Sequence, residues 1–302
     1  MAGLKELRNR IAAIKSTEKI TSAMKMVAAA RLRKAQDLLA QSEPCRRILY
    51  TAAGRIRAAE LRRAQETGIA PLLPQICRPH ETDENYLLLV FSSDRGLCGS
   101  YNAMIARTAV KRIEELLAAG KKVQIICWGQ RGYNALKRNY ADIITEHHEA
   151  LSGSIDYAAA AGLATELAAK FADGKIDVCE AVYSRFASAV RRENHCRRVL
   201  PLPTDIFADD NASDMYKNAF FESEPDDKTL MAALLPQIFK ELIFEIMIHS
   251  EASEQGARMT SMDNATRNAS DMISKLTLRY NRIRQTAITT ELVEIIAGAE
   301  AI

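Results

Sequence analysis

Two long segments at the ends of the chain carry apolar residues that step by three and four. In residues 1–67 the steps run through Leu4, Leu7, Ile11, Ile14, Ile20, Met24 and Val27. In residues 226–302 they run through Met262, Ala265, Ala269, Met272 and Leu276, with Ile273, Tyr280, Ile283 and Ala287 alongside. This spacing is typical of helices that pair as a coiled coil. At ~1.5 Å per residue each helix would be roughly 90–110 Å long, which is more than one globular core can cover.

Prolines and glycines mark where these two helices bend or end. Pro44 lies inside the first helix and predicts a kink there, and Pro236 predicts a bend near the start of the second. Gly68 and Pro71 predict the end of the first helix.

The middle of the chain changes period. Short apolar runs predict strands at Tyr86–Phe91, Val123–Cys127, Asp142–Glu146, Ile176–Tyr183 and Arg197–Leu202. Helical patterns at 102–119, 130–139 and 155–172 separate them. Strands that alternate with helices favour a mostly parallel, doubly wound sheet.

The predicted fold class is therefore an α/β insert on a long antiparallel coiled coil. We expect an N-terminal shaft helix at 1–67, an α/β domain at 80–203, a connector and foot at 204–225, and a C-terminal shaft helix at 226–302.

Charge is unevenly distributed although the net charge is only +3. Residues 1–34 hold nine lysines and arginines against two glutamates, whereas residues 205–227 are acidic. The basic first helix favours an anionic partner over a merely solvated face.

The six cysteines have no regular spacing, which predicts reduced and buried thiols. Met1–Arg10 lacks the apolar stretch of a secretory signal, and no run of ~20 apolar residues predicts a membrane span.

Candidate chemistry is sparse. The loop from Gly96 to Gly99 follows a strand and precedes a helix, where α/β folds bind phosphates, but it lacks the known glycine-rich phosphate motifs. A tight turn is the simpler interpretation. Cys98 would need a histidine partner to be catalytic. Adjacent His147 and His148 would point to opposite sides of a strand, so a surface loop is favoured over a metal site.

We therefore expect no catalytic residue, no cofactor and no metal. Two alternatives stay open. One is a small α/β enzyme with long oligomerising helices that binds phosphate at Gly96–Gly99. The other is a basic coiled-coil adaptor for nucleic acid or an anionic membrane.

Several segments resemble one family, the gamma subunit of F-type ATP synthase. They are Met1–Arg8, Thr17–Ala29, Ser93–Gly99, Ser253–Met259 and Tyr280–Leu292. The resemblance covers essentially the whole chain and is weakest over 130–225. It implies a rotating shaft that couples proton flow through a membrane ring of c subunits to ATP synthesis or hydrolysis in a head of three alpha and three beta subunits. The shaft is not itself catalytic.

The resemblance also implies contacts with the head. Arg284 and Gln285 match a pair that bonds a loop of an alpha or beta subunit, and Thr289 and Glu291 match polar positions in the same zone. Met24 and Lys25, facing Arg258 across the coiled coil, match the level of the acidic lever of a beta subunit.

A foot on the c ring is implied at Glu224, Pro225 and Asp226, with the aromatic Phe221 nearby. Ser223 departs from the Tyr of some members, and Ser100-Tyr101 departs from the usual Gly-Phe or Gly-Leu. The epsilon subunit is a further implied partner. Nucleic acid is not expected, and the membrane is reached only through the c ring. The expected location is the cytoplasmic face of a bacterial inner membrane.

Overall fold

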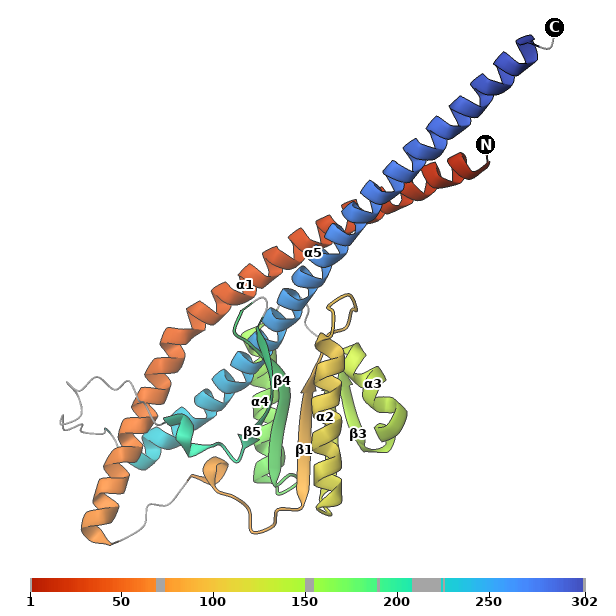
Figure 1. Cartoon of the computed structure of the whole chain (residues 1–302). Coiled ribbons are helices and arrows are strands. Elements are labelled where there is room, and N and C mark those ends of the chain that lie inside the picture. Colours follow the sequence, from red (N-terminus) through yellow and green to blue (C-terminus); the bar gives the residue numbers. More distant parts are fainter. Residues whose placement is uncertain are drawn as a thin grey trace. The chain divides into compact units, whose positions relative to one another are not determined.

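The computed structural model describes residues 2–68, 74–149, 155–188, 191–207, 224 and 226–300. It divides into two compact units. The first consists of residues 1–30 and 258–302, and the second of residues 31–257. The two helices α1 (Ala2–Thr67) and α5 (Asp227–Glu300), labelled in Figure 1, each contribute to both units.

In the first unit, α1 and α5 form an antiparallel pair. Thr266 donates a hydrogen bond from its hydroxyl to that of Thr21 at 2.8 Å, and Lys25 pairs with Asp263 at 2.6 Å. Because the partner number falls as the α1 number rises, the helices run in opposite directions. Antiparallel pairing of the terminal helices is thereby confirmed.

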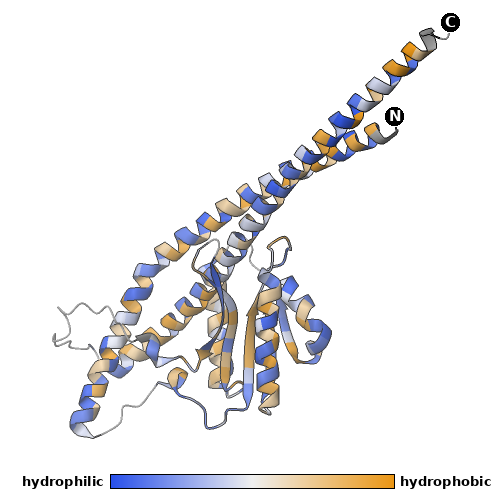
Figure 2. Cartoon of the chain, viewed as in Figure 1, coloured by the Kyte–Doolittle hydropathy of each residue, from blue (hydrophilic) through white to orange (hydrophobic). Residues whose placement is uncertain are grey.

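The seam between them follows the predicted period. Ala28 is 1% exposed, and Leu4, Leu7, Ile11 and Ile14 are half-buried while the lysines and arginines beside them are exposed. On α5 the seam continues from Ala269 to Ile273, because Met272 is 48% exposed. Figure 2 shows hydrophilic and hydrophobic residues alternating along both helices, as a two-helix seam requires.

In the second unit the same helices also run antiparallel. Arg46 lies 3.2 Å from Glu245, and Arg63 forms an ion pair with Asp227. Each helix continues through its internal proline, Pro44 or Pro236, without a break.

The second unit also holds a five-stranded sheet in the order β3-β2-β1-β4-β5. Its strands are β1 (Asn85–Phe91), β2 (Lys122–Trp128), β3 (Ile144–His148), β4 (Val178–Phe186) and β5 (Arg192–Leu200). Four strands are parallel, and β5 runs antiparallel to β4. The mostly parallel, doubly wound sheet is confirmed.

The helices of the α/β part are α2 (Tyr101–Ala118), α3 (Gln130–Tyr140) and α4 (Tyr157–Ala172). Short 3-10 turns lie at Gln75–Cys77, Ala141–Ile143 and Thr204–Phe207. Apolar residues of α2, such as Ile105 and Ile113, share one core cluster with Leu88 and Val90 of β1 and are 0–1% exposed. Residues that alternate with these, such as Leu87 and Leu89, point to the other side of the sheet.

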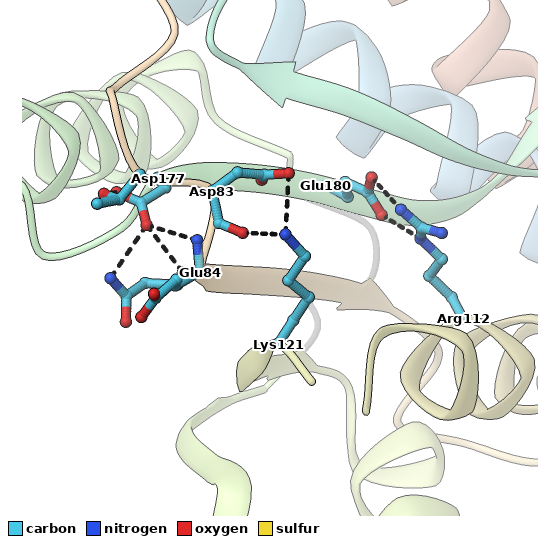
Figure 3. A network of polar contacts seen from close by, with 8 residues as sticks. Asp83, Glu84, Arg112, Lys121, Asp177 and Glu180 are labelled. Carbon is cyan, nitrogen blue, oxygen red and sulfur yellow. Dashed lines mark hydrogen bonds and ion pairs between the residues drawn. The ribbon is translucent and has the colours of Figure 1, made fainter. Parts of the chain in front are cut away.

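A polar network ties the start of the sheet together (Figure 3). The buried carboxylate of Asp177 accepts hydrogen bonds from the backbone N–H groups of Glu84 and Asn85 at 3.0 and 2.9 Å. Arg112 of α2 donates two hydrogen bonds to Glu180 of β4, at 2.7 and 2.8 Å. These bonds fix the entry of β1 and the position of α2.

Three local predictions need correction. His147 and His148 lie in the edge strand β3, not in a surface loop; the ring of His147 stacks on Tyr133, and His148 contacts Glu146. The strand β5 begins at Arg192, five residues before the predicted start. Cys45 and Cys196 are exposed, so the expectation of buried thiols holds for the other four cysteines only.

Candidate interaction surfaces

The C-terminal part of α5 exposes most of its side chains to solvent. Arg284, Gln285, Thr289 and Glu291 are all exposed. The hydroxyl of Thr289 donates to the backbone carbonyl of Gln285 at 2.9 Å, which is a bond within the helix. Among and beyond these polar positions, apolar side chains are 50–71% exposed: Ile288, Leu292, Val293, Ile295 and Ile296.

The pairing register says where these residues lie along the helix pair. Thr21 is level with Thr266, so Ala2 is level with about Gln285. The remaining turns of α5 reach ~20 Å beyond the first residue of α1, at ~1.5 Å per residue. Apolar side chains on that lone stretch of helix form a surface that another chain could cover.

The second predicted contact zone lies on the helix pair of α1 and α5, farther from the C-terminal end of α5. Met24 and Lys25 are half-buried, and Arg258 is 8% exposed. The structure gives Lys25 a partner that the sequence analysis missed, the carboxylate of Asp263. The hydrogen bond from Lys25 lowers the pKa of Asp263, and Arg267 at 2.8 Å acts in the same direction. Asp263 follows Arg258 by five residues, so Arg258 lies more than one helical turn away from the residue that pairs with Lys25.

Exposed apolar side chains flank this ion pair. Ile20, Met26 and Val27 are 55–64% exposed although they lie beside lysines. A mixed basic and apolar surface of this kind suits a partner that is both acidic and apolar.

The foot residues are only partly described. Glu224 and Asp226 are exposed, whereas Phe221 and Pro225 lie outside the described residues. Asp226 accepts from the backbone N–H and the hydroxyl of Thr229, at 2.9 and 2.6 Å. These bonds, the hydroxyl of Thr229 first, lower the pKa of Asp226. The carboxylate thus stays ionised at the N-terminal end of α5, where the helix dipole favours negative charge.

The loop from Ser93 to Gly99 is a tight strand-to-helix turn. Its polar side chains bond one another: Ser93 and Asn102 exchange hydrogen bonds, and the amide of Asn102 lies 3.1 Å from the sulfur of Cys98. Leu97 and Gly99 adopt positive φ angles of 65° and 60°. Cys98 is 1% exposed, which does not suit a thiol that must meet a substrate.

No group of three or more metal-ligating side chains gathers in the part of the chain that the structure describes. Among the same residues, no helix is both long and apolar enough to cross a bilayer.

The comparisons with known proteins decide the family. A family model described as ATP synthase matches residues 3–302. The chain is 44% identical over 303 residues to an ATP synthase gamma chain from Acidiphilium cryptum and 43% identical over 306 residues to one from Rhodospirillum rubrum. Each comparison covers 100% of both chains. The chain belongs to the family of ATP synthase gamma chains.

Solved structures agree on the fold. A chain from the Euglena gracilis mitochondrial ATP synthase, in a structure of OSCP, F1 and c-ring, has a TM-score of 0.63 at 17% identity. That likeness covers 99% of this chain and 94% of the other. A chain from a structure of the central stalk and c-ring of the Tetrahymena thermophila mitochondrial ATP synthase has a TM-score of 0.57 at 23% identity. That likeness covers 82% of this chain and 99% of the other. Family and fold together make the chain the central shaft of an F-type ATP synthase.

Proposed function

We propose that the chain turns inside a head of three alpha and three beta subunits and couples proton flow through a c ring to ATP synthesis or hydrolysis. The observation that carries this proposal is the lone upper stretch of α5, whose exposed isoleucines, leucine and valine call for a surrounding surface. The coupling ion would be selected in the c ring, outside this chain.

Two zones would touch the head. Arg284, Gln285, Thr289 and Glu291 are exposed on α5, where a loop of an alpha or beta subunit could reach them. Lower down, Lys25 with Met24 would meet an acidic lever of a beta subunit. Arg258, which is 8% exposed, would support that zone from within more than by direct contact.

The foot would rest on the c ring through Glu224 and Asp226, with Phe221 and Pro225 beside them. The ionised carboxylate of Asp226 is held by Thr229 and would offer a fixed negative charge to the ring. An epsilon subunit would bind near the same end. The complex would then sit as a peripheral assembly on the cytoplasmic face of a bacterial inner membrane, as the bacterial origin of its relatives suggests.

The coupling follows from symmetry. A two-helix shaft presents a different face to each of three equivalent beta subunits. Each beta subunit therefore gains different contact free energy from each orientation of the shaft, and rotation changes which nucleotide-site conformation is favoured.

Reconstitution tests this proposal. Alpha and beta subunits from the same source are combined with the full chain, and ATP hydrolysis and size-exclusion elution are measured with and without it. We expect one large complex whose steady hydrolysis depends on the chain. Separate elution with unchanged hydrolysis would refute the role.

The head contact is tested by Arg284→Ala combined with Gln285→Ala. Both side chains are exposed, so the double variant should fold normally and lose coupled ATP synthesis in membranes. Lys275→Ala, exposed on the same helix and outside both zones, is the matched control. Unchanged synthesis in the double variant would remove Arg284 and Gln285 from the contact.

A further inference from the structure

A basic cleft lies in the second unit, and none of its lining residues belongs to the contact zones or the foot described above. It has a volume of about 1020 Å³ and lies between the β4–β5 hairpin and the facing stretches of α1 and α5. Arg46, Arg185, Arg197 and Arg198 line it, against the two acids Asp205 and Glu245. Arginines in such excess around a cavity favour an anionic ligand.

The strand register gathers four polar side chains on one face. Tyr183 of β4 pairs with His195 of β5, and Ala181 pairs with Arg197. Because alternate residues of a strand share a face, Tyr183 and Arg185 lie beside His195 and Arg197. Burial raises the pKa of Tyr183, and the nearby guanidinium of Arg197 acts to lower it.

The helix α1 completes the opposite side. Arg46 and Tyr50 are four residues apart, so they lie on the same face of the helix. Glu245 holds the guanidinium of Arg46 at 3.2 Å. The hydroxyl of Tyr50 is buried and has no hydrogen-bond partner among the described residues. Burial, and then the charge of Glu245, raises the pKa of Tyr50, so its hydroxyl remains a donor at neutral pH.

Three of the arginines are not held in ion pairs by residues that the structure describes. Within the described ranges, no carboxylate forms an ion pair with Arg185, Arg197 or Arg198, whereas Arg191 on the same hairpin pairs with Glu193 at 2.9 Å. The buried hydroxyl of Tyr50 is costly without a partner, and an oxygen-bearing ligand in the cleft would supply one.

We propose that this cleft binds a phosphate-bearing anion of nucleotide size. The planar guanidinium groups of Arg185 and Arg197 match phosphate oxygens in pairs, and Tyr50 can donate one further bond. The volume far exceeds that of a single phosphate and suits a ligand with an attached organic group. The ring of His195, which is half-buried and lies 5.9 Å from that of Tyr183 between centroids, is the aromatic group nearest to such a ligand in the lining.

Calorimetry on the full chain tests the proposal, with ADP, pyrophosphate and adenosine as probes. ADP should bind more tightly than pyrophosphate, and adenosine should not bind measurably. Arg185→Gln and Arg197→Gln should each weaken ADP binding about 10-fold or more, because each removes a charge-assisted pair of bonds. Arg191→Gln, outside the cleft, should change it less than about 2-fold.

A headgroup of an anionic phospholipid carries the same chemistry, so vesicles that contain phosphatidylglycerol form a second arm. Vesicle binding that Arg185→Gln abolishes and Arg191→Gln retains would support the cleft and identify a lipid as the source of the phosphate. Binding of none of the probes at millimolar concentration, or equal losses in the cleft variants and in Arg191→Gln, would overturn the proposal. Arg185 is exposed, so its variant reports on binding even if Arg197→Gln disturbs the Tyr183 contact.

Discussion

Replacing Asp177 with Asn should destabilise the sheet-bearing unit. The carboxylate is 2% exposed and accepts four hydrogen bonds: from the backbone N–H groups of Glu84 and Asn85, from the side-chain amide of Asn85 at 3.0 Å, and from the hydroxyl of Thr82 at 3.1 Å. An amide keeps the shape and one acceptor oxygen, but it removes the charge that strengthens every bond.

The magnitude follows from those bonds. Hydrogen bonds to a charged group contribute about 1.5–3 kcal/mol each, and neutral bonds about 1 kcal/mol. Three of the four bonds end on one carboxylate oxygen and would be converted from charged to neutral. At a loss of about 0.5–2 kcal/mol for each, we expect the free energy of unfolding to fall by about 1.5–6 kcal/mol. Asp177→Ala, which leaves two backbone N–H groups unpaired, should cost about 3–5 kcal/mol.

Urea unfolding is the assay, followed by the fluorescence of Trp128, which is the single tryptophan of the chain and lies in β2. Asp173→Asn is the control, because that carboxylate is 57% exposed and, among the described residues, pairs with the exposed Lys175 alone. A change below about 0.5 kcal/mol for Asp177→Asn, equal to the control, would refute the reasoning.

Three further predictions rest on other contacts. Burial acts to raise the pKa of Asp177, but hydrogen bonds from the backbone N–H groups of Asn85 and Glu84 outweigh it, so the pKa in the folded protein lies below 3.8. The native protein should therefore lose stability as the pH falls below about 4. Urea titrations at several pH values should show a smaller loss for Asp177→Asn than for the native protein. Gly132→Ala would place a Cβ 2.5 Å from the hydroxyl oxygen of Ser92 and should lower the free energy of unfolding by about 1–3 kcal/mol. Gly162→Ala, in a helix with open space around it, should raise the free energy of unfolding by up to about 1 kcal/mol. Equal effects of the two variants in thermal melts would contradict this packing. Asp263→Asn removes a partly exposed pair and should change stability by less than about 1 kcal/mol by circular dichroism; a larger loss would mean that this ion pair matters more than its exposure suggests.

The sequence predicted the elements whose residues face a continuous core. The strands β1 and β2 are buried, apolar runs, and each was located to within one residue. The strand β5 was placed five residues late, because its first half is an edge segment of charged residues whose position depends on pairing with β4. His147 and His148 were assigned to a loop for the same reason: an edge strand with one exposed face has no apolar signal.

The sequence also does not predict the register between α1 and α5, that is, which of their residues stand opposite one another. The heptad pattern of α1 predicts a seam but not which residue of α5 stands opposite Lys25, since a shift of one turn leaves the apolar pattern almost unchanged. The resemblance suggested Arg258, and the structure pairs Lys25 with Asp263. The basic cleft was equally out of reach, because its residues come from α1, β4, β5 and α5 and meet only in the folded chain. In the sequence, the adjacent arginines Arg197 and Arg198 are a weak trace of it.

The length by which α5 outruns α1 has a mechanical consequence. Below the first residue of α1 two helices share any sideways load, and their interlocked side chains resist bending together. Above it a single helix carries the load alone, and isolated long helices curve readily. If a partner surface surrounds this last stretch of α5, that surface determines how straight the helix is. The bending stiffness at this end would then come from the partner and not from the helix pair.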